Sequence, residues 1–210
     1  MPLQASRFES TWATVSLATA VRAAPGEEAR VVARLDPTTP EGTTNLVQTL
    51  NRAKDVQGSL WIRVRFPGFP DNTTGWVRRR ALGGGGVVST RLVVDLGARQ
   101  VTLFRGGRAV FRAAVGIGTA AAPTPTGEFY VRNKLTRYRS PFYGPIAFGT
   151  SARSPTLTDW PAGGFVGIHG TNRPDLIPGA VSHGCIRLRN GDIVRLARLM
   201  PIGTALTIRA

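Results

Sequence analysis

The chain has 210 residues, 42% of them hydrophobic, which excludes a disordered or fibrous protein and allows one domain or two small domains with separate cores. No run approaches the ~18 consecutive apolar residues that a transmembrane helix needs, and the first ten residues lack the charged-then-apolar pattern of a secretory leader. The formal charge of +15 lies mainly after residue 86, where 16 Lys and Arg stand against 5 acidic residues. This excess favours either a polyanionic partner or a solvated basic surface, and charge alone does not choose between nucleic acid, a membrane surface and an acidic polymer.

Short strands and frequent turns are expected, because 25 Gly and 15 Pro are scattered along the chain without a repeat. In the first half, Ser59–Arg65 alternates apolar and polar residues as a half-buried strand does, and another such strand begins at Gly75–Val77. These strands predict a small barrel over residues 12–82. The stretch Thr38–Gly58 is longer than a minimal barrel requires and is interpreted as an insert.

A boundary is predicted at Gly83–Gly86, since four residues without side chains are typical of a flexible linker. The chain is therefore divided into a barrel at residues 12–82, a linker at 83–89 and a second domain at 90–210.

The second domain is predicted to be mainly β with one helix. Its strand signals are Arg91–Asp95, Gln100–Phe104, Ala109–Val115, Glu128–Arg132, Ile146–Phe148, Phe165–Ile168 and Ala205–Ile208. The helix is expected at Gly191–Met200, with Asn190 as its N-cap, Asp192 in its first turn and Pro201 ending it.

A long aromatic segment, residues 139–164, interrupts the strand pattern before His169. It is too long and irregular for a tight turn, so it is either a lid over a cleft or an ordinary surface excursion. The aromatic residues in and beside it are Tyr138, Phe142, Tyr143, Phe148 and Trp160.

The chain's two histidines and single cysteine fall within seventeen residues. One cysteine excludes an internal disulfide, and a thiol of ordinary pKa, about 8.5, is only a few per cent thiolate at neutral pH. An enzyme that uses Cys185 as a nucleophile therefore needs a base, which must be His169 or His183. His183 shares a face with Cys185 if the chain is extended there, and His169 precedes Cys185 by enough chain to fold back, so the spacing allows both.

Two neighbours of the cysteine suit acyl transfer. Gly184 would allow a sharp turn that presents N–H groups to an oxyanion, and Arg187 could bind a substrate carboxylate or favour the thiolate. Two other interpretations remain open. One is a buried, inert Cys185. The other is a zinc site, whose ligands would be His169, His183, Cys185 and Asp175.

The residues around Cys185 resemble the signature of the L,D-transpeptidase (YkuD-type) catalytic domain, and the resemblance extends over about residues 90–210. The signature positions are His169-Gly170, Ser182-His183-Gly184-Cys185-Ile186-Arg187-Leu188, Asn190 and Asp192. Further matching stretches are Val115–Gly118, Pro123–Phe129 and Pro201–Thr204. The resemblance implies a β sandwich with a short helix beside the site.

The first half resembles a bacterial SH3-like domain, with Val21–Gly26 as its opening strand and turn and Gly75–Val77 as its closing strand. Such barrels bind cell-wall peptides or act as spacers. The expected fold class is therefore mainly β, with an N-terminal SH3-like small barrel and a C-terminal L,D-transpeptidase sandwich.

The L,D-transpeptidase resemblance also implies the roles of individual residues. Cys185 would be the nucleophile and His169 the base, oriented by the backbone carbonyl of Gly170. The amides of residues 183–185, that is His183, Gly184 and Cys185, would form the oxyanion hole, and Ser182 and His183 would support their loop. No metal or other cofactor is implied.

The implied reaction is attack on the bond between the third residue of a peptidoglycan stem peptide and its terminal D-Ala. A thioester forms, and an amine from a second stem resolves it to make a 3→3 cross-link. Water as acceptor would make an L,D-carboxypeptidase, and loss of activity would leave a wall-binding protein. The family works outside the cytoplasmic membrane and its cysteine is acylated by carbapenems. We expect a monomer with donor and acceptor stems as partners, and no nucleic acid.

Overall fold

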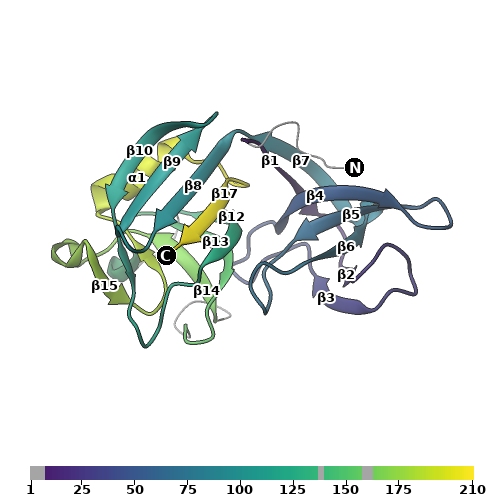
Figure 1. Ribbon diagram of the computed structural model, residues 1–210, viewed down its shortest axis with the longest axis horizontal. Coiled ribbons are helices and arrows are strands. Elements are labelled where there is room, and N and C mark those ends of the chain that lie inside the picture. The colour runs from purple at the N-terminus through teal and green to yellow at the C-terminus, as the bar shows by residue number, and fades with distance from the viewer. Residues whose placement is uncertain (1–7, 137–139, 158–162) are drawn as a thin grey trace.

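The strands of the protein fall into two sheets that lie side by side (Figure 1). The computed structural model describes residues 8–136, 140–157 and 163–210. We call residues 8–88 the N-terminal module and residues 89–210 the C-terminal domain, because strands up to residue 88 belong to one sheet and later strands to the other. The predicted mainly β fold class is confirmed. Among the described residues, no helix is long and apolar enough to cross a membrane.

The N-terminal module is built on a seven-stranded sheet. Its strands are β1 (Ser10–Val15), β2 (Thr19–Arg22), β3 (Val31–Leu35), β4 (Leu46–Lys54), β5 (Leu60–Arg65), β6 (Thr74–Arg78) and β7 (Leu82–Val88), with a 3₁₀ turn at Arg79–Ala81. They are hydrogen-bonded in the order β3-β2-β6-β5-β4-β1-β7. Its likeness to SH3-like domains stays a prediction.

The C-terminal domain carries a ten-stranded sheet and the helix. The strands are β8 (Thr90–Asp95), β9 (Gln100–Arg105), β10 (Arg108–Ala114), β11 (Gly116–Gly118), β12 (Gly127–Leu135), β13 (Ala147–Arg153), β14 (Phe165–His169), β15 (Gly179–Ser182), β16 (Ile186–Arg187) and β17 (Ala205–Arg209). They follow the order β10-β9-β8-β17-β12-β13-β14-β16-β11-β15. The helix is α1 (Asn190–Leu199), and 3₁₀ turns lie at Pro141–Tyr143 and Pro174–Leu176.

The core of the C-terminal domain lies between the sheet and α1. Strand β8 alternates buried and half-buried residues, as its sequence predicts, and α1 turns Ile193, Leu196 and Ala197 inward at helical spacing. Each fully buried aliphatic side chain contributes roughly 1.5–3 kcal/mol. This packing gives the short strands around the candidate site a rigid support.

The predicted N-cap of the helix is wrong. Arg189 occupies the cap position and Asn190 is the first helical residue. The Asn190 side chain instead accepts a hydrogen bond, 2.9 Å long, from the backbone N–H of Thr171. The Asn190 side chain therefore bonds the loop after β14 and does not form the helix cap that its sequence position had predicted.

The predicted flexible linker is also wrong, because Gly83–Gly86 lies inside β7. This strand pairs with β1 in an antiparallel register that sets Ala13 opposite Gly85 and Trp12 opposite Gly86. A Cβ at Gly86 would lie 3.1 Å from the Trp12 ring. The glycines therefore serve close approach between two strands, which composition alone does not distinguish from flexibility.

Two substitutions distinguish these roles of the glycines. A methyl group at Gly85 would overlap the Trp12 carbonyl, whereas Gly84 has open space around its Cβ position. We expect Gly85→Ala to lower the free energy of unfolding in urea by about 1–3 kcal/mol and Gly84→Ala to leave it within about 0.5 kcal/mol. Equal tolerance of both substitutions would support a flexible linker instead.

Two long segments also differ from the interpretation of their sequences. Thr38–Gly58 is not an insert, since it contains β4, which pairs with both β1 and β5. Residues 139–164 are not one excursion, since β13 within them is buried and pairs with β12 and β14. Tyr138 and Trp160 of the proposed lid lie outside the described residues.

The N-terminal module is packed against the C-terminal domain through buried polar contacts. The hydroxyl of Tyr130 on β12 donates to the carbonyl of Leu46 at 3.0 Å, and Ser10 Oγ donates to the carbonyl of Gly203 at 2.9 Å. Glu41 of the module also forms a buried ion pair with Arg132 of β12. Burial raises the pKa of Tyr130 above its ordinary value, so its phenol stays protonated as the donor.

Candidate active site

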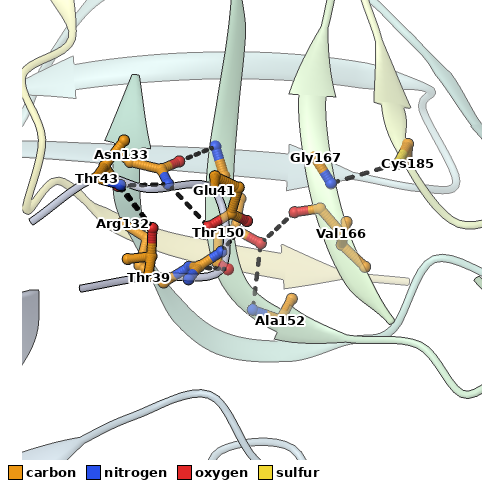
Figure 2. Close-up of polar contacts among 11 residues, drawn as sticks. Thr39, Glu41, Thr43, Arg132, Asn133, Thr150, Ala152, Val166, Gly167 and Cys185 are labelled. Carbon is orange, nitrogen blue, oxygen red and sulfur yellow. Dashed lines mark hydrogen bonds and ion pairs between the residues drawn. The ribbon is translucent and has the colours of Figure 1, made fainter. Parts of the chain in front are cut away.

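Cys185 lies in the loop between β15 and β16, with its side chain turned toward β14. Gly184 before it has φ +117°, a conformation that L side chains rarely adopt, so the sharp turn requires glycine. Cys185 is 5% exposed, and the Gly167 N–H donates to its Sγ at 3.3 Å (Figure 2). A backbone donor at this position stabilises negative charge on the sulfur.

His169 ends β14, and strand pairing places it beside the cysteine. The parallel register between β14 and β16 sets Ile168 opposite Ile186 and His169 opposite Arg187. Cys185 immediately precedes β16, so its side chain reaches the same edge of β14 that carries the histidine. The chain between them provides the crossover that a parallel pair needs.

The His169 ring is held in a defined orientation. Its Nδ1 lies 2.6 Å from the carbonyl oxygen of Gly170, and the ring makes a T-shaped contact with Tyr143, with centroids 4.7 Å apart. A carbonyl can only accept, so Nδ1 carries the proton and the neutral ring has its basic lone pair on Nε2. His169 is 1% exposed. The predicted orienting carbonyl and the predicted base are thus in hydrogen-bond contact.

The loop that carries Cys185 is fixed by two hydroxyl groups. Ser182 Oγ donates to the Cys185 carbonyl at 2.6 Å and accepts the Gly184 N–H at 3.1 Å. Thr124 Oγ1 donates to the Gly184 carbonyl at 2.9 Å. The Gly184 amide, one of the predicted oxyanion donors, is thus hydrogen-bonded to Ser182 within the loop.

A cavity of about 290 Å³ joins these residues. It is lined by Phe142, Tyr143, Leu157, His169, His183, Cys185 and Arg187. His183 is exposed at its rim, in contrast to the buried His169. Within the described part of the chain, the buried Nε of Arg187 has no hydrogen-bond partner. The cavity therefore presents a thiol, an oriented imidazole and a guanidinium with an unused donor to one ligand.

Three residues hold the site in a way that was not predicted from the sequence, where Asn190 was assigned only to the helix cap and the family signature. Tyr143 packs on the His169 ring, Thr124 holds the cysteine loop, and Asn190 holds the turn after His169. Thr124 and Asn190 fall within the stretches quoted for the family resemblance, which was the available signal. For Tyr143, the only signal in the sequence was its position in the aromatic segment, residues 139–164.

The zinc interpretation is not supported by the side-chain arrangement. In the described ranges, no three His, Cys, Asp or Glu residues are grouped so that they could hold a metal ion. Asp175, the fourth ligand of that interpretation, instead pairs with Arg173 at the surface, and this guanidinium holds the pKa of the carboxyl below its usual value.

Known proteins are similar to this chain in sequence. Residues 89–208, more than half of the chain, match the family described as the YkuD L,D-transpeptidase catalytic domain. The chain belongs to this family. L,D-transpeptidases are enzymes that act on the stem peptides of peptidoglycan. The chain is 37% identical to YkuD of Bacillus subtilis (strain 168) over 143 residues, which make up 68% of this chain and 72% of that protein.

Two solved L,D-transpeptidase structures are also similar. A crystal structure of an Enterococcus faecium L,D-transpeptidase mutant shares 24% identity over 57% of this chain, with a TM-score of 0.45. The match spans about half of that protein, 49% of its chain. An L,D-transpeptidase from Mycobacterium smegmatis shares 14% identity over 79% of this chain and 91% of its own, with a TM-score of 0.49.

Proposed function

We propose that this protein is a peptidoglycan L,D-transpeptidase that forms 3→3 cross-links through a thioester on Cys185 and releases D-Ala. The observation that carries the proposal is that Cys185, His169 and Arg187 line one cavity, in which the His169 ring is oriented by the Gly170 carbonyl. Membership of the L,D-transpeptidase family supports the substrate class.

The first half-reaction transfers an acyl group to sulfur. His169 Nε2 takes the thiol proton, and the Cys185 sulfur attacks the carbonyl carbon between the third stem residue and D-Ala. The amides of His183 and Cys185 are the candidate donors to the oxyanion. The C–N bond breaks, D-Ala leaves as an amine with the proton from His169, and the thioester remains.

The second half-reaction transfers the acyl group to the acceptor. His169 removes a proton from the amine of a second stem, and the nitrogen attacks the thioester carbon. The C–S bond breaks, and the proton passes from His169 to the sulfur, which returns the thiol and the neutral ring. Water in place of the amine would give L,D-carboxypeptidase activity by the same steps. A wall-binding protein without activity would leave the oriented His169 and its cavity without a use.

Positive charge suits the carboxylates of a stem peptide. Arg187 lines the cavity with a buried Nε that lacks a partner among the described residues, so a substrate carboxylate there would satisfy it. The excess of basic residues after residue 86 would attract the acidic polymer at longer range. These partners lie in the wall, so we propose a location outside the cytoplasmic membrane.

Product analysis on purified muropeptides tests the proposal. The protein is incubated with tetrapeptide donors and an acceptor stem, and the products are resolved by mass spectrometry. A 3→3 dimer with one D-Ala released per link is expected. Tripeptide and D-Ala without dimers would identify the carboxypeptidase alternative, and unchanged muropeptides would contradict both activities.

A further inference from the structure

A chain of buried polar contacts connects the N-terminal module to the strand beside Cys185 (Figure 2). It starts at Glu41, whose carboxylate accepts from Arg132 Nη2 on β12 at 2.5 Å. Arg132 Nε donates to the Thr150 carbonyl on β13 at 3.3 Å, and Thr150 Oγ1 donates to the Val166 carbonyl on β14 at 2.7 Å. Each step crosses to the next strand toward the active site.

The last contact acts on the peptide group that faces the cysteine. The Val166 carbonyl and the Gly167 N–H belong to one planar peptide unit. Thr150 Oγ1 holds the oxygen of this unit, and its N–H donates to Cys185 Sγ at 3.3 Å. A hydrogen bond to the oxygen orients the unit and strengthens the N–H as a donor. Thr150 therefore bonds the same peptide unit whose N–H faces the sulfur.

The sheet is irregular at the places where Arg132 and Thr150 lie. The β12–β13 register shifts between Val131 and Asn133, and the β13–β14 register shifts between Gly149 and Arg153. Regular ladder bonds are disrupted at such bulges. Side-chain contacts of Arg132 and Thr150 replace them, so the position of β14 depends on these two residues more than it would in a regular sheet.

Glu41 neutralises the buried charge of Arg132. The two side chains are 3% and 2% exposed, and a charge buried at this depth requires a partner. The Glu41 loop is stapled by the Thr39–Thr43 hydroxyl contact at 2.8 Å, and Thr43 in turn accepts from Asn133 Nδ2 at 3.1 Å. These contacts hold the Glu41 carboxylate of the N-terminal module against Arg132 of β12.

We propose that Glu41 is a positioning residue for the nucleophile: through Arg132 and Thr150 it aims the Val166–Gly167 peptide at Cys185. The N-terminal module, although it forms a separate sheet, then contributes a residue that positions the nucleophile. The inference rests on the proposed role of Cys185 as nucleophile, and it assigns to the module a task inside the reaction centre.

The test measures the rate of Cys185 alkylation by iodoacetamide between pH 5 and 10, which needs no peptidoglycan. In Glu41→Gln we expect the rate at pH 7 to fall about tenfold, because a misaligned N–H favours the thiolate less. At pH 10 the rate should equal that of the wild type, since the thiol is then ionised in both. Unfolding would instead raise the alkylation rate at pH 7, because it exposes a sulfur that is buried in the folded protein.

Glu27→Gln is the control for removal of an arginine-paired carboxylate at a more exposed position, 47% against 3% for Glu41. Glu27 also belongs to the N-terminal module and pairs with arginines, but its partners Arg22 and Arg78 lie in the same module. We expect its alkylation profile to match the wild type. A folded Glu41→Gln variant whose profile also matches the wild type would overturn the inference.

A second pair of variants decides the question if Glu41→Gln does not fold. Thr150→Val removes the hydroxyl that bonds the Val166 carbonyl, and Thr150→Ser keeps it. We expect reduced alkylation at pH 7 for the valine variant and rescue by the serine variant. Identical profiles for both would contradict the inference. A wild-type thiol with no enhanced reactivity at pH 7 would contradict the proposed nucleophile itself, which separates the two failures.

Discussion

Replacing Cys185 by alanine is expected to lower the rate of D-Ala release by at least about 10⁴-fold, since removal of the nucleophile eliminates the covalent pathway. Oxyanion donors and substrate binding remain and would support only a residual rate. The measurement is D-Ala release from purified tetrapeptide muropeptides. The substitution is small and the side chain touches the cavity, so the fold should persist.

A carbapenem adduct provides the matching measurement on the protein itself. Incubation of the wild type with a carbapenem should add one drug mass, because the family's cysteine opens the β-lactam to form an acyl-enzyme. Cys185→Ala should show no added mass. An adduct of equal yield on the alanine variant, or none on the wild type, would refute the assignment of Cys185.

Replacing His169 by alanine is expected to reduce both D-Ala release and alkylation at pH 7 by about 10²–10⁴-fold, the usual contribution of a general base. The Nδ1 of the buried His169 ring is bonded to the Gly170 carbonyl, which leaves the basic lone pair on Nε2. His183 is exposed at the cavity rim, so His183→Ala should reduce the same rates by less than about tenfold.

The two histidine variants control for each other, because they remove the same chemical group from the same cavity. Loss of thiol reactivity confined to His183→Ala would reverse the assignment of the base. Equal loss in both would mean that neither ring acts alone. Cooperative thermal unfolding of each variant should be recorded beside the rates, since His169 is buried against Tyr143.

Local pattern predicted most of the strands, because alternation of apolar and polar residues reflects which side of each strand is buried. Strand β8 and strand β9 each extend one residue beyond the predicted range, and α1 is displaced by one residue from its predicted range. Predictions were wrong where one sequence pattern has two possible physical causes. Glycine repeats serve either flexibility or close approach, and in β7 the neighbouring β1 decides between them.

The candidate site divides in the same way. The sequence placed Cys185 beside a flexible Gly184 and named two histidines as bases, and the family signature chose His169. The contacts of the ring, with the Gly170 carbonyl and Tyr143, depend on residues whose spacing carries no signal. The use of the Gly184 amide by Ser182 is likewise a matter of loop geometry.

The sequence by itself determined the mainly β fold class, the family and the candidates Cys185, His169 and His183, because these follow from residue type, periodicity and a long local signature. Only the tertiary structure decided which histidine is oriented beside the cysteine and that Gly83–Gly86 is a strand. It also decided that Glu41 reaches the sheet of the active site. The physical reason is that strand pairing and buried charge pairs join residues distant in the chain, and their energies depend on neighbours that no local window contains.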